Sequence, residues 1–181
     1  MGLRFALADP PYLGCGAKHY GRHHADAADC DNPEWHRALI GRLVNEYPDG
    51  WAMCLHSPSL RTLLPMCPDD VRIGAWVKPF GAFKVNVNPA YVWEPVIKRG
   101  DRKRTREQDT ARDWLAESIT LKRGLTGAKP RAFTLWLCDL LNVQPGDQVD
   151  DLFPGSGAVQ ASLNERLKVQ PPPLTLFGDA A

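Results

Sequence analysis

The most constraining feature of the sequence is an apolar run, residues 3–8, that stops at Asp9-Pro10-Pro11-Tyr12. Proline has no N–H group to donate to a sheet, so a strand over residues 3–8 must end at Asp9. In open α/β sheets, ligands bind beyond the carboxyl ends of the strands. This corner presents a carboxylate, a carbonyl and an aromatic ring together, which suits a flat ligand with an exocyclic amino group. A proline-stiffened polar turn without a ligand is the alternative.

A second corner of this kind lies near the other end of the chain. A predicted strand, residues 148–152, leads into Phe153-Pro154-Gly155-Ser156-Gly157 and then into a predicted helix, residues 158–167. The two glycines allow a ligand to approach the backbone closely, and the helix directs its N-terminus at that ligand. Dinucleotides bind in such turns, but Gln160 replaces the third glycine of the G-x-G-x-x-G pattern and the expected later acid is not evident. No G-x-x-x-x-G-K-[ST] motif occurs, which excludes a P-loop.

These two corners, with a third motif between them, resemble a known family. Asp9-Pro10-Pro11-Tyr12 is similar to the [DNS]-P-P-[YFW] motif of methyltransferases that act on exocyclic amines of nucleobases, in the form most common among adenine-N6 enzymes. Asp151-Leu152-Phe153-Pro154-Gly155-Ser156-Gly157 resembles the D-x-F-x-G-x-G loop with which this family binds S-adenosylmethionine. Lys129-Pro130 resembles the Lys-Pro pair that precedes that loop by one helix. The order of the motifs matches the circularly permuted branch of the family.

The resemblance implies an α/β chain with a Rossmann-like, three-layer methyltransferase fold, a mostly parallel sheet and a circularly permuted order, in a single domain over residues 1–181. It implies methyl transfer from S-adenosylmethionine to a nucleobase amino group, with adenine N6 in DNA as the expected target. The implied catalytic residues are Asp9, Pro10, Pro11 and Tyr12. The implied cofactor-binding residues are Ala8, Asp9, Lys129, Pro130, Asp151, Leu152, Phe153, Gly155, Ser156 and Gly157. The acid that grips the cofactor ribose in the family has no clear match; Asp179 is the nearest candidate.

Two stretches of clustered positive charge are candidates for nucleic-acid contact. The first lies in a predicted loop, residues 13–32, and carries Lys18, His19, Tyr20 and Arg22. The second is the run Lys98, Arg99, Arg102, Lys103, Arg104 and Arg106. Such clusters are typical of phosphate-contacting segments, although a solvated surface is the alternative for each. The formal net charge of +1 gives no overall attraction to nucleic acid, so these local clusters carry the prediction.

The basic insert, about residues 98–128, is too short for a separate target-recognition domain. Recognition of a base sequence is therefore expected to be minimal, or to be completed by a protein partner or a second copy of the chain. A zinc site from Cys15, His19, His23 or His24, and Cys30 is a further alternative for the first loop. Because the spacing of these residues matches no standard zinc framework, no metal is predicted.

Composition and periodicity complete the predicted fold. Apolar spacing and the Asn32-Pro33-Glu34 start predict a helix over residues 33–47, and a stripe of apolar residues predicts another after Lys129-Pro130. Strands are predicted over residues 51–56, 71–77 and 90–98. Glu94 lies inside the last of these strands and needs a partner, while Pro95 favours a sheet edge or a bulge. His56 follows a buried strand, and a structural role is favoured over a role in the site.

The chain of 181 residues contains no apolar stretch long enough to span a membrane and no basic region leading into a long apolar run. Its five cysteines form no C-x-x-C pair, as is typical of reduced thiols, so a cytoplasmic protein is expected. Two other functions stay open at this stage. One is an inactive methyltransferase-like subunit that binds nucleic acid or a partner; the other is a methyltransferase for a small molecule or a protein glutamine.

Overall fold

The computed structural model describes residues 2–22, 25–80, 85–119, 129–155 and 157–167. Its strands are β1 (Arg4–Ala8), β2 (Trp51–Cys54), β3 (Arg72–Val77), β4 (Trp93–Arg99), β5 (Trp114–Ala116) and β6 (Gln148–Asp151). Its α-helices are α1 (Gly16–Tyr20), α2 (Pro33–Glu46), α3 (Leu60–Leu63), α4 (Arg131–Leu141) and α5 (Ala158–Leu167). Short 3-10 segments are η1 (Ala25–Asp31), η2 (Ser57–Ser59) and η3 (Leu64–Met66).

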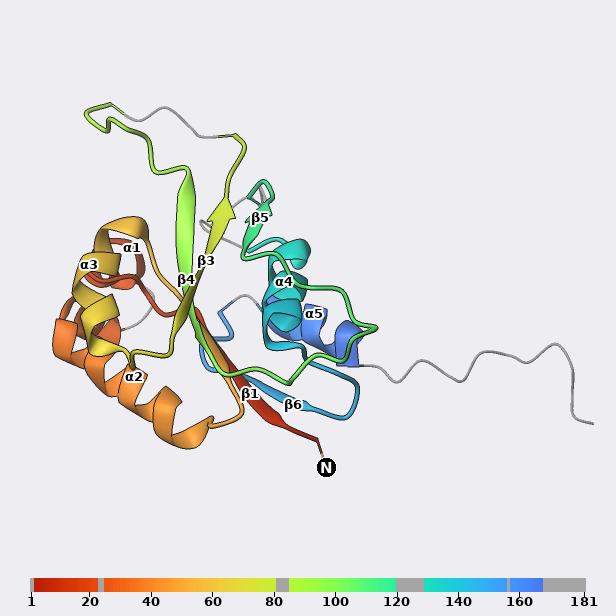
Figure 1. The fold of residues 1–181 in the computed structure, drawn as a ribbon. Coiled ribbons are helices and arrows are strands. Elements are labelled where there is room, and N and C mark those ends of the chain that lie inside the picture. The colour runs from red at the N-terminus through yellow and green to blue at the C-terminus, as the bar shows by residue number, and fades with distance from the viewer. Residues whose placement is uncertain (1, 23–24, 81–84, 120–128, 156, 168–181) are drawn as a thin grey trace, which may run out of the picture.

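The strands form one sheet in the order β5-β3-β4-β2-β1-β6. Strand β4 is antiparallel to both of its neighbours, and the other neighbouring pairs are parallel. Helices α1, α2 and α3 cover one face of the sheet, while α4 and α5 cover the other (Figure 1). The predicted three-layer α/β architecture with a mostly parallel sheet is therefore confirmed.

Strand β1 shows why both faces of the sheet are covered. Phe5 and Leu7 pack in the core shared with α4 and α5, whereas Ala6 and Ala8 pack in the core shared with α2. Successive side chains of a strand point to opposite faces, so an unbroken apolar run such as residues 5–8 requires a helical layer on each side. Because β1 lies between β2 and β6, its carboxyl end lies beside the carboxyl ends of two parallel strands.

The prediction of a loop without helices over residues 13–32 was wrong. Helix α1 and segment η1 lie within it, and one acidic side chain joins them. The carboxylate of Asp31 accepts hydrogen bonds from the backbone N–H groups of Gly16, at 2.7 Å, and Ala17, at 3.0 Å. These N–H groups form the first turn of α1 and have no partner within the helix. The cap comes from a residue far along the chain, so no local pattern could show it.

The prediction of an edge position or a bulge at Pro95 was also wrong, since β4 lies between β3 and β2. The Pro95 carbonyl still accepts a hydrogen bond from the N–H of Leu55, at 3.2 Å. Leu55 directly follows the end of β2 at Cys54. Proline has no N–H group, and at Pro95 the missing group would point toward β2 just beyond the last pair of the β2–β4 ladder. A central strand therefore tolerates proline at this position.

Other elements differ from the predictions mainly at their ends. The strand predicted to begin at residue 90 begins at Trp93. Helix α4 ends at Leu141, and the residue that caps it, Asn142, has a left-handed backbone with φ of 52°. Strand β5 was not predicted, because three residues are too few to show a periodic pattern. Within the described part of the chain, no helix has the length and apolarity needed to cross a membrane.

Candidate functional site

The two corners singled out in the sequence lie side by side at one edge of the sheet. Leu7 of β1 is in register with Asp151 of β6, and Ala8 of β1 is in register with Met53 of β2. All three strands run in the same direction, so Asp9, Asp151 and the residues after β2 meet beyond the carboxyl ends of neighbouring strands. Segments that are far apart in the sequence thus form one site.

A cluster of charged and hydroxyl groups occupies this edge. The Tyr12 hydroxyl donates to Glu94 Oε2 at 2.6 Å and lies 3.3 Å from Asp9 Oδ1. Lys129 Nζ donates to the Tyr12 oxygen at 2.8 Å, to Asp9 Oδ2 at 3.1 Å and to Glu94 Oε2 at 3.3 Å. Lys78 forms an ion pair with the other oxygen of Glu94. The cluster therefore joins the end of β1, the β3–β4 pair and the start of α4.

Burial and neighbouring charges fix the protonation states in this cluster. Burial, followed by the charges of Asp9 and Glu94, raises the pKa of Tyr12 well above its usual value, so its hydroxyl stays protonated. Burial disfavours the charged form of Lys129, but Asp9 and Glu94 outweigh it and hold the lysine pKa above its usual value. Burial also acts to raise the pKa of Glu94, yet Lys129 and Lys78 hold that pKa below its usual value. The cluster thus contains charged Lys129 and ionised Glu94.

His56 contacts the ring of Tyr12, which the sequence did not predict. The two rings stack with centroids 5.6 Å apart and planes 15° apart. The hydroxyl of Ser59 lies 2.6 Å from His56 Nδ1 and orients the imidazole. Burial lowers the pKa of His56, so the ring is neutral near pH 7. His56 supports the tyrosine ring as a flat platform.

The glycine turn after β6 has the geometry needed for close approach of a ligand. Gly155 and Gly157 have φ of 45° and 75°, which are left-handed conformations that favour glycine. Oδ1 of Asp151 accepts from the N–H of Phe153 at 3.2 Å, whereas Oδ2 is buried and has no hydrogen-bond partner among the described residues. Ser156, also predicted to bind cofactor, lies outside the described residues.

Asp151 lines a small cavity of about 10 Å³ together with Asp9 and Lys129. The rest of the lining is apolar and consists of Ala8 and other side chains of β1, β2, α4 and α5. Burial raises the pKa of Asp151, and the charge of Asp9 adds to this effect. An unpaired buried carboxylate oxygen is costly, so this atom is suited to accept a donor from a ligand. Of the other residues predicted to bind cofactor, Leu152 and Phe153 pack in the core with α2, and Pro130 precedes α4.

The two basic stretches lie at opposite ends of the sheet. Helix α1 carries Lys18, His19 and Tyr20, all exposed, and follows closely after Tyr12 of the site. Burial raises the pKa of Tyr20, and the charge of Asp9 adds to this effect. The run that begins at Lys98 lies at the other end, since Arg99 pairs with Trp51 at the start of β2. Arg22 follows α1 and is exposed.

Several side chains of the second run have partners within the chain, and the predicted contact of this run with nucleic acid stays a prediction. Lys98 is 8% exposed and pairs with Asp101, and Arg102 pairs with buried Asp147. Arg99 pairs with Asp70, and Arg104 donates to the carbonyls of Asp109 and Asp139. Of these four residues, Lys98 is buried, Arg99 and Arg102 are partly exposed, and Arg104 is exposed. Lys103 and Arg106 are exposed, so their predicted contact with nucleic acid stays a prediction.

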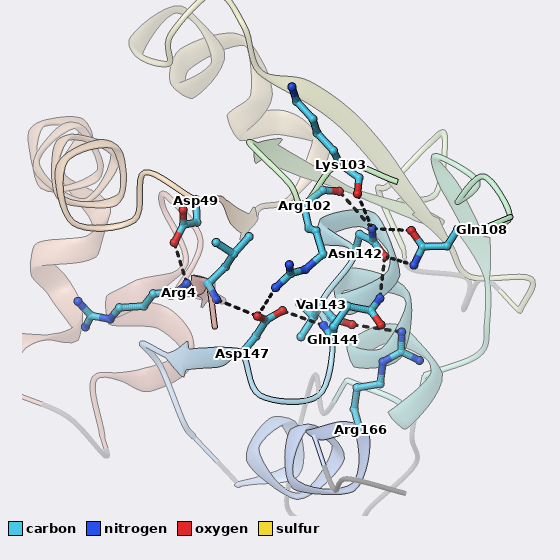
Figure 2. A network of polar contacts seen from close by, with 11 residues as sticks. Arg4, Asp49, Arg102, Lys103, Gln108, Asn142, Val143, Gln144, Asp147 and Arg166 are labelled. Carbon is cyan, nitrogen blue, oxygen red and sulfur yellow. Dashed lines mark hydrogen bonds and ion pairs between the residues drawn. The ribbon is translucent and has the colours of Figure 1, made fainter. Parts of the chain in front are cut away.

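Figure 2 shows the network that holds this run. Asn142 Nδ2 donates to the carbonyl of Arg102 at 3.2 Å and to Gln108 Oε1 at 3.2 Å. Asp147 accepts from the backbone N–H groups of Leu3 and Gln144, both at 2.8 Å, and from Arg102. The network joins the start of β1, the basic run and the turn between α4 and β6, and it lies away from the site.

The zinc alternative finds no support in the described part of the chain. Within it, no group of three or more His, Cys, Asp or Glu side chains is arranged to hold a metal ion. His23 and His24 lie outside the described residues.

Lys78 and Glu94 were not predicted as site residues. Glu94 did give a signal, because an acid within a buried strand needs a partner. That partner is the cluster itself, through Tyr12, Lys78 and Lys129.

Several solved structures share this fold. The structure of M1.HpyAVI in complex with SAM matches with a TM-score of 0.57 and 16% identity, covering 92% of this chain and 79% of that chain. A second M1.HpyAVI structure matches with a TM-score of 0.56 and 16% identity, over 92% and 78% of the two chains. A protein of Thermus thermophilus, described as a candidate DNA modification methylase, matches with a TM-score of 0.53 and 17% identity, over 91% and 77%.

No protein-family model matches the chain, and no curated protein matches it. At identities of 16–17%, the matches establish the fold. The chain has a mixed α/β, Rossmann-like fold of the type found in S-adenosylmethionine-dependent methyltransferases.

Proposed function

We propose that this chain is an S-adenosylmethionine-dependent methyltransferase that acts on an exocyclic amino group of a nucleobase, with adenine N6 in DNA as the target. The observation that carries the proposal is the juxtaposition of Asp9 and Tyr12 with Asp151 and the glycine turn at one edge of the sheet. The fold similarity to a SAM complex and to a candidate DNA modification methylase supports the cofactor and the polymer. The circularly permuted motif order and the single domain belong to the same proposal.

The residues of the glycine turn fit S-adenosylmethionine. Gly155 and Gly157 leave room beside the backbone, and the unpaired Asp151 Oδ2 is a suitable acceptor for the ammonium group of the methionine part. When bound, this cofactor supplies an electrophilic methyl group on a sulfonium. Trp35 packs on Phe153 of the turn, with ring centroids 6.0 Å apart, and supports its conformation.

The acceptor groups of the corner explain how an unreactive amine becomes a nucleophile. The lone pair of a nucleobase amine is delocalised into the ring, and hydrogen bonds from its two N–H groups to acceptors favour a localised lone pair. Asp9 and the carbonyl of Pro10 supply these acceptors, and Pro11 keeps the corner rigid. Tyr12, supported by His56, supplies a surface on which the base stacks. The base must be unpaired or flipped out of a duplex to reach the site.

The amine loses one proton overall, and this proton leaves after the methyl group has been transferred. Asp9 therefore has to orient the amine and stabilise developing positive charge, without acting as a strong base. No covalent bond between protein and base is needed. Near the site, the residues proposed to contact the nucleic acid lie in or directly after α1: Lys18, His19, Tyr20 and Arg22. A protein partner or a second copy that completes target recognition stays part of the proposal.

The first test is calorimetric titration of the protein with S-adenosylmethionine, with Gly155→Asp as the matched variant. We expect binding by the wild type and loss of binding in the variant, because an aspartate there adds strain and negative charge to the turn. The second test incubates the protein with radiolabelled cofactor and single-stranded or duplex DNA or RNA, and identifies the methylated nucleoside by mass spectrometry. N6-methyladenine in DNA is the expected product. Well-folded protein that binds no cofactor would instead favour the inactive, partner-binding function.

A further inference from the structure

Glu94 is the one acid of the site that no motif assigns, and it shares its contacts with Asp9. Among the donors near the Asp9 carboxylate are Lys129 Nζ at 3.1 Å and the Tyr12 hydroxyl at 3.3 Å. Oε2 of Glu94 receives the same two donors, the hydroxyl at 2.6 Å and the ammonium at 3.3 Å. The two carboxylates are therefore alternative acceptors for one pair of donors.

This arrangement matters because the proposed reaction needs Asp9 to accept an N–H of the substrate. Asp9 Oδ2 pairs with Lys129 at 3.1 Å, whereas the single Tyr12 proton goes to the nearer Glu94, so the substrate amino group competes chiefly with Lys129 for the Asp9 carboxylate. A displaced ammonium in a buried site is costly unless another anion holds it. Lys129 is almost fully buried, with 8% of its side chain exposed, and Glu94 is the other anion within reach.

We propose that Glu94 is a positioning residue that holds the Tyr12 hydroxyl proton and takes Lys129 from Asp9 when the substrate amino group arrives. This inference rests on the proposed function. It adds a residue, Glu94, that keeps the Asp9 carboxylate available to accept the substrate amine. The shift is small, because the ammonium already lies at similar distances from the two acids, 3.1 Å and 3.3 Å. Lys129 Nζ also lies 5.5 Å from the centre of the Trp76 ring and 5.7 Å from that of Phe133.

Lys78 makes this exchange electrostatically neutral. It forms an ion pair with the Oε1 atom of Glu94, the oxygen that neither Tyr12 nor Lys129 uses. Together, Asp9 and Glu94 balance Lys78 and Lys129, so the exchange transfers hydrogen bonds without changing the charge of the cluster. Glu94 also lies in the centre of the sheet on β4, a rigid element suited to holding a fixed acceptor.

The test measures recognition of the amino group separately from methyl transfer. The probes are two fluorescent single-stranded oligonucleotides in a thymine background, one with a single adenine and one with purine, which lacks the amino group, in its place. Binding is measured by anisotropy for the wild type, Glu94→Gln and Glu94→Gln/Lys129→Met. Glu46→Gln is the matched control, because it makes the same chemical change in an exposed ion pair with Arg42.

We expect the wild type to bind the adenine probe more tightly than the purine probe. Glu94→Gln should weaken adenine binding about tenfold and leave purine binding unchanged, because Lys129 then stays on Asp9. The double variant should recover part of the adenine preference. In methyl transfer, Glu94→Gln should raise KM for the polymer, while calorimetric binding of S-adenosylmethionine is unchanged.

If Glu94→Gln is poorly folded by thermal unfolding, Lys78→Met/Glu94→Gln replaces it. This pair removes one charge of each sign, and the same loss of adenine preference is expected. Wild-type adenine preference and KM in either folded variant would overturn the role of Glu94 while leaving the methyltransferase proposal intact. A wild type that neither distinguishes the probes nor transfers methyl groups would overturn both.

Discussion

The two ends of the sheet each carry a polar network, and the networks are built differently. At the amino ends of the parallel strands, Asp147 accepts from two backbone N–H groups and from Arg102, and Asn142 Nδ2 donates to two backbone carbonyls and to Gln108 (Figure 2). At the carboxyl ends, the bonds that join Asp9, Tyr12, Glu94 and Lys129 run between side chains, and two acids share the same donors. The first network holds the chain in one arrangement, whereas the second can exchange partners.

The difference teaches how to interpret clustered charge in this protein. The basic run from Lys98 to Arg106 has the higher density of positive charge, yet most of its side chains have partners within the chain. Arg102 pairs with Asp147 of the fixed network, Lys98 pairs with Asp101, and Arg99 pairs with exposed Asp70. The site contains fewer charges, but they are buried and share partners, which is the arrangement expected where a ligand has to enter. Burial and shared contacts distinguish the two ends better than the amount of charge does.

The largest expected effect is on catalysis, at Asp9. Asp9→Ala removes the carboxylate that orients the amine, so methyl transfer should fall by at least about a hundredfold. The glycine turn and Asp151 are unchanged, so calorimetric binding of S-adenosylmethionine should persist. If Asp9→Ala kept the wild-type rate of methyl transfer, the cluster of Asp9, Tyr12, Glu94 and Lys129 would not be the catalytic centre.

The next effect is on stability, at the other end of the sheet. Asp147→Ala leaves Arg102 and two backbone N–H groups without their acceptor, and should lower the free energy of unfolding by about 3–5 kcal/mol. Asp70→Ala is the control, since Asp70 pairs with Arg99 but its side chain is 62% exposed, and should cost at most about 1 kcal/mol. Urea unfolding measures both values; equal losses would remove the distinction between a fixed network and a surface pair.

A smaller effect is expected on nucleic-acid affinity. Charge reversal of Lys18 and Arg22 should weaken binding of single-stranded DNA and reduce the slope of log affinity against log salt by about 0.7 for each lost phosphate contact. The same reversal of Lys103 and Arg106 should have less effect, because these residues lie at the end of the sheet away from the site. Salt-dependent anisotropy titrations compare the two variants, and a larger loss in the second would place the nucleic acid at the opposite end.

The smallest effect is a difference in acid sensitivity. Lys129 and Lys78 outweigh burial and hold the pKa of Glu94 below its usual value of 4.5. The stabilisation from ionised Glu94 is therefore complete above pH 4.5 and is lost as the pH falls through the lower folded-state pKa. The free energy of unfolding is measured with urea near neutral pH and again below the usual glutamate pKa. Its decrease between the two pH values should be smaller for Glu94→Gln than for the wild type. An unchanged pH dependence would show that Glu94 is not stabilised as an anion.

The sequence predicted those features that depend on local patterns. The apolar run ending at Asp9 predicted β1 and its corner, the capping signals predicted α2, and the glycine turn predicted the end of β6. It did not predict α1, whose cap comes from Asp31, or the central position of Pro95, which depends on where β2 ends. Those features depend on contacts between segments far apart in the chain.

The same division applies to the candidate site. Local patterns in the sequence predicted the chemical groups of the site: a carboxylate and a tyrosine after one strand, and an acid with two glycines after another. The tertiary structure was needed to show that Glu94 and Lys78 join Tyr12 and Lys129, and that most of the basic run pairs within the chain. A residue's chemistry is local, but its partners and its burial follow from the packing of the strands, so charge alone could not separate structural residues from those of the site.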